Sequence, residues 1–207
     1  MREVVLLAVC SALTFAACGP AALSLGPPDP AVEEDYAATL ADWTRGDRIY
    51  TSFETQVVVH ATFLSRAFQE AYLKEYARVF RPTAQEAARV RSELDSRREH
   101  AECFFMAVFA GQRDWNDFAL GNSIWRLHLE TDGGERVRSS HVGTVQADDL
   151  AYVHFFPYLD SFFEGYTVCF DSRSGEGAAL LHEGTRSFTL ELASPVGRID
   201  LTWKVSD

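Results

Sequence analysis

The first periodic segment of the chain predicts a helix followed by a strand. Apolar side chains recur three to four positions apart after Asp29-Pro30, at Val32, Tyr36, Leu40 and Trp43. This is the period of a helix with one buried face, which Pro30 opens and Gly46 ends. Over residues 48–63 apolar and polar side chains alternate instead. We therefore expect one long strand there, with one side toward the core.

The next segment predicts two helices. Phe68, Tyr72, Tyr76 and Val79 have helical spacing, and Arg81-Pro82 ends that helix. Thr83 and Glu86 have the spacing of a capping box, which opens a second helix at about residues 84–100. The second helix is polar on most positions, so we place it on the surface. Together they predict a helical hairpin inserted at about residues 65–100.

From Cys103 onward the pattern is that of strands. Residues 103–109 are apolar at every position, as in a central strand covered on both faces. Asp132-Gly133-Gly134 is a hairpin loop that would pair Glu130 with Arg136 and Leu129 with Val137. The strands expected around this loop and after it cover residues 123–131, 135–145, 150–156, 166–170, 186–192 and 198–205.

These elements predict an α+β protein that is mainly β. The expected architecture is an antiparallel β-sandwich with an N-terminal helix and the inserted helical hairpin. The order Cys103, Trp125, Cys169 is similar to the Cys, Trp, Cys order of immunoglobulin domains, so we describe the sandwich as immunoglobulin-like. We see no second linker, and we expect residues 31–207 to form a single domain.

The N-terminus has the pattern of an export signal. Residues 4–17 form an apolar run after Met1 and Arg2. This run is shorter than the ~20 residues that a transmembrane helix needs, and its length suits the apolar region of a secretory signal peptide. It ends in Phe15-Ala16-Ala17-Cys18-Gly19.

That ending resembles the lipobox of bacterial lipoproteins, although Leu is usual where this chain has Phe15. The resemblance implies cleavage before Cys18, a diacylglyceryl group on its thiol and acylation of the new amine. Residues 1–17 would then be the signal peptide and residues 18–30, which are rich in Pro and small residues, a lipidated tether. Gly19, in place of the Asp that favours retention in the inner membrane, implies the outer membrane facing the periplasm. The alternative is ordinary cleavage near Ala17, which gives a protein without lipid.

Net charge limits the classes of partner. The formal charge is −11, and loss of residues 1–17 removes one Arg and one Glu and leaves it unchanged. Such acidity disfavours nucleic acid and electrostatic adsorption to anionic lipid. Attachment to a membrane would therefore depend on the lipid of Cys18.

Two cysteines remain in the expected mature domain besides Cys18, and they admit two interpretations. Export to an oxidising compartment favours a disulfide between Cys103 and Cys169. Strand alternation, however, puts Cys169 on the more polar face with Thr167 and Asp171. A pair of buried free thiols is the alternative.

The sequence contains no recognisable catalytic or metal-binding motif. No two histidines have the short spacing of a zinc site, and there is no Gly-x-Ser-x-Gly elbow or phosphate-binding glycine loop. We expect no metal and no cofactor, and the pattern favours a protein that is not an enzyme. One alternative is an envelope hydrolase whose site is assembled from separated strands, using His60, His128 or His154. Another is a lipoprotein that binds a small molecule or a metal.

An aromatic stretch is the one candidate for a partner surface. It contains Phe155, Phe156, Tyr158, Phe162 and Phe163. These rings could form an exposed patch that binds another protein. The interpretation we favour is that they fill one end of the sandwich beneath its helices, because aromatic side chains most often bury their large area.

Three short segments are similar to segments of bacterial envelope lipoproteins that have no assigned activity: Trp43-Thr44-Arg45, residues 61–65 and Ser123-Ile124-Trp125. This similarity carries no function over. The leading hypothesis is a lipid-anchored, non-catalytic protein that binds or scaffolds another component of the periplasm or outer membrane.

Overall fold

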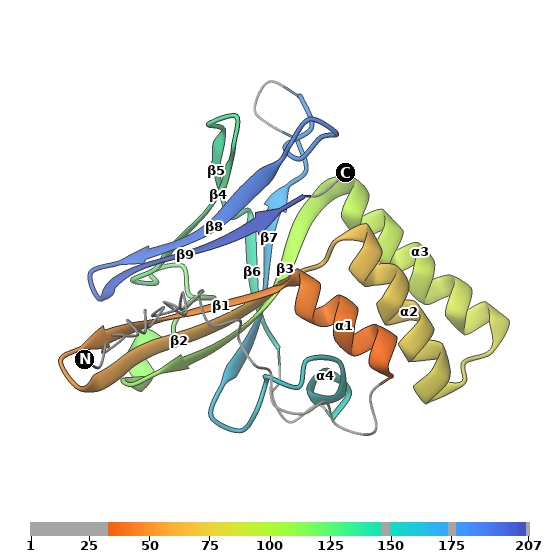
Figure 1. The fold of residues 1–207 in the computed structure, drawn as a ribbon, viewed down its shortest axis with the longest axis horizontal. Coiled ribbons are helices and arrows are strands. Elements are labelled where there is room, and N and C mark those ends of the chain that lie inside the picture. Colours follow the sequence, from red (N-terminus) through yellow and green to blue (C-terminus); the bar gives the residue numbers. More distant parts are fainter. Residues whose placement is uncertain (1–32, 146–149, 174–176, 206–207) are drawn as a thin grey trace, which may run out of the picture.

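The computed structural model describes residues 33–145, 150–173 and 177–205 (Figure 1). The expected signal peptide, Cys18 and the tether lie outside these residues. The described chain is a mixed α and β structure, mainly β, with two antiparallel sheets and four α-helices. None of the described helices is long and apolar enough to cross a membrane.

The first sheet has five strands in the order β1-β2-β3-β7-β6. Their bounds are β1 Thr44–Thr51, β2 Glu54–Phe63, β3 Ala101–Ala110, β7 Glu164–Asp171 and β6 His141–Val145. The second sheet has four strands in the order β5-β4-β8-β9. Their bounds are β5 Arg136–Arg138, β4 Arg126–Thr131, β8 Ser187–Ser194 and β9 Gly197–Lys204.

The two sheets share one apolar core. Alternate residues of neighbouring strands point to the same side, so each sheet turns one face toward the other. The first sheet contributes Val57, Val59, Phe104, Met106, Val168 and Phe170, and the second contributes Leu127, Leu129, Phe188, Leu190, Leu201 and Trp203. Along one side the sheets also meet directly, because Arg45 Nε of β1 donates to the Thr202 carbonyl of β9 at 3.1 Å. Next to this contact, Trp203 Nε1 donates to the carbonyl of Trp43, the residue before β1, at 2.8 Å.

A second core lies on the other face of the five-stranded sheet. It packs Phe105 and Ala107 of β3 against the helices α1 Glu34–Trp43, α2 Arg66–Phe80 and α4 Leu150–Phe155 and the residues after α4. Strand β3 is therefore covered on both sides, with Cys103 to Val108 all buried. The prediction of a central strand is confirmed.

The inserted helices were also predicted from local sequence. Along the chain, α2 and α3 (Ala84–His100) follow β2 and precede β3. These two strands nevertheless pair directly, so the helices are an insertion at the end of the sheet (Figure 1). Arg81 is left-handed at the end of α2, with φ of 47°, and both hydrogen bonds of the Thr83–Glu86 capping box are present. No residue of α3 is buried, so this helix lies on the surface as expected.

The long strand expected over residues 48–63 is wrong: the segment is a hairpin of β1 and β2, which turns at Ser52 and Phe53. Ser52 has φ of 57° there. Apolar and polar side chains alternate on both sides of the turn, so the alternation does not mark it. Helix α1 also ends earlier than expected, at Trp43, and Gly46 lies inside β1 opposite His60.

Two further strand predictions need correction. Residues 150–155 form the short helix α4 where a strand was expected. The expected strand over residues 135–145 divides into β5 and β6, which belong to different sheets. The hairpin register within it is confirmed, since Leu129 pairs with Val137 and Glu130 with Arg136. A short 3-10 helix at Arg113–Trp115 was not expected.

Candidate functional site: a cleft at one end of the two sheets

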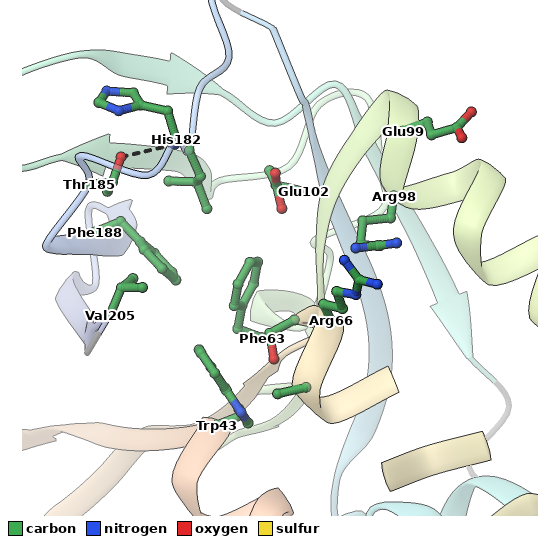
Figure 2. A pocket seen from close by; sticks show the side chains of 13 residues that line it. Trp43, Phe63, Arg66, Arg98, Glu99, Glu102, His182, Thr185, Phe188 and Val205 are labelled. Atoms are coloured by element: carbon green, nitrogen blue, oxygen red, sulfur yellow. Dashed lines mark hydrogen bonds between the residues drawn. The ribbon is translucent and has the colours of Figure 1, made fainter. Parts of the chain in front are cut away.

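A cleft of about 530 Å³ opens where α2 and α3 join the five-stranded sheet and face the second sheet (Figure 2). This volume falls within the range of about 300–1,000 Å³ that is typical of sites for small molecules. The residues that line it come from α1, β2, α2, α3, β3 and β8, from the chain just before α2 and β8, and from the residue that follows β9.

One side of the cleft is apolar. Phe63, the last residue of β2, lies 5.8 Å from Trp43 and 4.8 Å from Phe188 between ring centroids. Trp43 is the last residue of α1 and is half-buried, and its carbonyl accepts the Trp203 hydrogen bond that ties the end of α1 to the second sheet. Leu181 and Val205 extend this side. The apolar side is thus the open end of the main core.

The other side carries charge. Arg66 is the first residue of α2, Arg98 lies in the last turn of α3, and Glu102 follows in β3. Figure 2 shows the guanidinium groups of Arg66 and Arg98 next to one another, with the carboxyl group of Glu102 between them and the apolar side. The pKa of the Glu70 carboxyl is lowered mainly by its hydrogen bond with Arg91. The charges of Arg66 and Arg98 lower it further, by a smaller amount.

The charged groups of the cleft have few partners in the described part of the chain. Arg98 Nη2 donates to Asp95 Oδ1 at 3.1 Å, whereas its Nε is buried without a hydrogen-bond partner. Burial raises the pKa of the Glu102 carboxyl, and the charge of Arg98 partly opposes this effect. A buried donor that lacks a partner costs about 1–3 kcal/mol of stability.

The hydroxyl and imidazole groups of the cleft serve local structure. Ser65 Oγ accepts from the Phe68 amide at 3.1 Å and caps α2. Thr185 Oγ1 accepts from the His182 amide at 3.1 Å, and His182 Nδ1 accepts from the Gly184 amide at 3.0 Å. The groups that could act as nucleophile and base are therefore engaged in a cap and a turn.

The three histidines considered for hydrolysis lie in three separate places, and none lines the cleft. His154 Nε2 is 2.8 Å from Glu75 Oε1, beneath α2. His128 Nδ1 is 3.4 Å from Glu191 Oε1 in the second sheet. His60 packs against Tyr158 and Phe163. Two of the three thus approach a carboxylate, but the structure does not bring them together.

The His154–Glu75 pair belongs to a buried structural cluster. Glu75 has a fully buried side chain, and Arg78 binds both of its oxygens, with Nε–Oε2 at 2.7 Å and Nη2–Oε1 at 2.6 Å. These hydrogen bonds lower the pKa of Glu75. The hydrogen bond with Arg78 has the larger effect, and the one with His154 has a smaller effect. Both carboxylate oxygens are occupied, so the cluster holds α4 onto α2.

The aromatic stretch lies mostly inside the protein. Phe155, Phe156 and Tyr158 are buried in the second core, and Phe163 packs against that core. The rings of Phe155, Phe156 and Tyr158 fill the space between the five-stranded sheet and the helices, whereas Phe163 is only partly buried. Phe162 alone of the five is strongly exposed, at 74%.

A disulfide joins Cys103 and Cys169, which pair directly across β3 and β7. Both residues are buried on the face of the sheet that the helices cover, as their alternation with Phe104 and Val168 requires. Within the described residues, no group of three or more His, Cys, Asp or Glu side chains could hold a metal ion.

Comparisons give no further guidance: no protein-family model matches the chain, and no curated protein and no solved structure shows significant similarity to it. The residues that line the cleft carry no sequence motif; the sequence drew attention to Trp43 and to the segment with Phe63 and Ser65, but not as parts of a binding site. They are spread over most of the domain, and only the packing of the two sheets brings them together.

Proposed function

We propose that this protein is an exported, lipid-anchored and non-catalytic component of the bacterial cell envelope. In this proposal the chain is cut before Cys18, lipid on Cys18 holds it on the outer membrane facing the periplasm, and the folded domain binds another envelope component. The segment Phe15-Ala16-Ala17-Cys18-Gly19 supports the anchor. The Cys103–Cys169 disulfide supports export, because disulfides persist in oxidising compartments.

The observation that carries the binding function is the cleft. It combines a concave apolar side with a few charged groups, the usual composition of a ligand site. Hydrolysis has less support, since the hydroxyl and imidazole groups of the cleft are engaged locally and His60, His128 and His154 lie elsewhere. The immunoglobulin-like architecture also has less support, because this disulfide joins neighbouring strands of one sheet, whereas that of antibody domains joins the two sheets.

The anchor is tested by metabolic labelling with a radioactive fatty acid. We expect label in the wild-type protein and none in Cys18→Ser, and the intact mass of the mature protein should equal residues 18–207 plus acyl groups. An unlabelled wild-type protein, or a mature chain that begins at another residue, contradicts the anchor.

The binding function is tested by photo-crosslinking in living cells. A crosslinking amino acid at Leu181, in the cleft, should capture a defined envelope component, and the same amino acid at Arg89, on the exposed side of α3, should not. Equal patterns from the two positions would contradict a role for the cleft in binding.

A further inference from the structure

Arg66 is in a position that helix stability does not explain. It is the first residue of α2, where the helix dipole disfavours a positive charge, and the first turn of α2 has no acidic residue. It forms no ion pair within the described chain, and it lines the cleft next to Arg98. Two neighbouring guanidinium groups repel each other, and an anion bound between them relieves this repulsion. The Glu70 carboxylate acts on both arginines, but Arg91 already binds both of its oxygens, so the pair still has donors for an anionic ligand.

The opposite side of the cleft requires that the ligand also has an apolar body. Phe63 and Phe188 form the buried floor of the cleft, whereas Trp43 and Leu181 are partly exposed along it and Val205 is 38% exposed at its edge. A small inorganic anion would leave these surfaces in contact with water. Burial of apolar area contributes roughly 25 cal/mol per Å², so an apolar group attached to the anion adds affinity.

Glu102 favours a carboxylate over a more highly charged anion. Its carboxyl group lines the cleft, and the charge of Arg98 acts on it there. A negative charge at this position repels a phosphate dianion more strongly than a carboxylate monoanion. The planar guanidinium groups match the two oxygens of a carboxylate.

We propose that the cleft binds a small organic carboxylate with an apolar body, the carboxylate held by Arg66 and Arg98 and the body packed against Trp43, Leu181 and Val205. This inference rests on the proposed function of the cleft as a binding site and names the ligand class of that site. The ligand is small, since the cleft encloses about 530 Å³.

The proposal is tested by calorimetric titration of the full mature protein, held in phosphatidylcholine nanodiscs, with 4-phenylbutyrate. Empty nanodiscs correct for partition into lipid. We expect saturable binding of 4-phenylbutyrate, at least tenfold weaker binding of 4-phenylbutylamine, and no detectable binding of acetate. The amine has the same body with the opposite charge, and acetate has the charge without the body.

Variants locate the binding to the two arginines. Arg66→Met and Arg98→Met each remove a charge-assisted contact and should weaken binding about tenfold or more. Arg89→Met is the matched control, because Arg89 lies on α3 outside the cleft and pairs with Glu93. Its affinity should equal that of the wild type. Urea unfolding establishes that each variant is folded, and Arg66 has no described partner whose loss would unfold the protein.

Four results would overturn the assignment: no saturable binding of 4-phenylbutyrate, equal binding of the amine, unchanged affinity in both arginine variants, and tighter binding of 3-phenylpropyl phosphate. The last would assign the cleft to phosphate esters. If crosslinks from Leu181 capture an envelope component while 4-phenylbutyrate does not bind, the ligand class is wrong and the proposed function stands. If 4-phenylbutyrate binds and Leu181 captures no component, the ligand class stands and the binding of an envelope component through the cleft is wrong.

Discussion

The Cys103–Cys169 disulfide should provide a large part of the stability of this domain. The two residues are separated by 66 positions in the chain, so the bond closes a long loop in the unfolded state. The chain-entropy relation for a loop of this length gives about 4 kcal/mol at 25 °C. Because a domain is typically stable by about 5–15 kcal/mol, the reduced protein should keep only about 1–11 kcal/mol.

Equilibrium unfolding in urea measures this contribution. Cys103 and Cys169 are only 4% and 7% exposed, so reduction requires prior unfolding in denaturant and then refolding with the reductant present. The reduced protein should lose about 4 kcal/mol of its free energy of unfolding and show a steeper dependence on urea, because its unfolded chain exposes more surface. A Cys103→Ala, Cys169→Ala double variant is the control, and the reductant should not change its midpoint.

A loss below about 1 kcal/mol would refute the loop-entropy argument. A count of free thiols in the unfolded, unreduced protein provides an independent check. It should find no thiol at residue 103 or 169, and finding both would show that no bond joins them.

Three further results are expected from particular contacts. Glu75→Ala should cost about 3 kcal/mol in urea unfolding, because it leaves the partners of a buried carboxylate unpaired, whereas Glu70→Ala removes an exposed ion pair and should cost less than about 1 kcal/mol. Burial lowers the pKa of His60, so the folded state favours its neutral form. The contribution of this group to the free energy of unfolding should be fully present above about pH 6.5 and decline as the pH falls below it. The decline should be smaller in His60→Gln. A decline of equal slope in that variant would assign the effect to another group. Thr83→Ala removes the capping box of α3 and should lower the free energy of unfolding by about 1 kcal/mol, and an unchanged midpoint would show that the cap contributes nothing.

Sequence alone determined the elements whose cause is local. The helix over residues 84–100 was predicted with its bounds, because Thr83 and Glu86 cap it and Arg81-Pro82 separates it from α2. The register of β4 and β5 follows from the loop at residues 132–134, since loop length fixes which residues face each other. The burial of β3 on both faces was also visible, as an unbroken apolar run.

Tertiary structure decided the features that depend on distant partners. Alternation continues through the turn at Ser52 and Phe53, so only the pairing of β1 with β2 distinguishes a hairpin from a strand. The apolar run at residues 150–155 fits either a strand or a buried helix, and its packing beneath α2 selects the helix. The cleft depends on tertiary structure most of all. Arg66, Arg98 and Phe188 are ordinary residues in their own segments, and they form a site only because two sheets and a helical insertion meet at one end of the core.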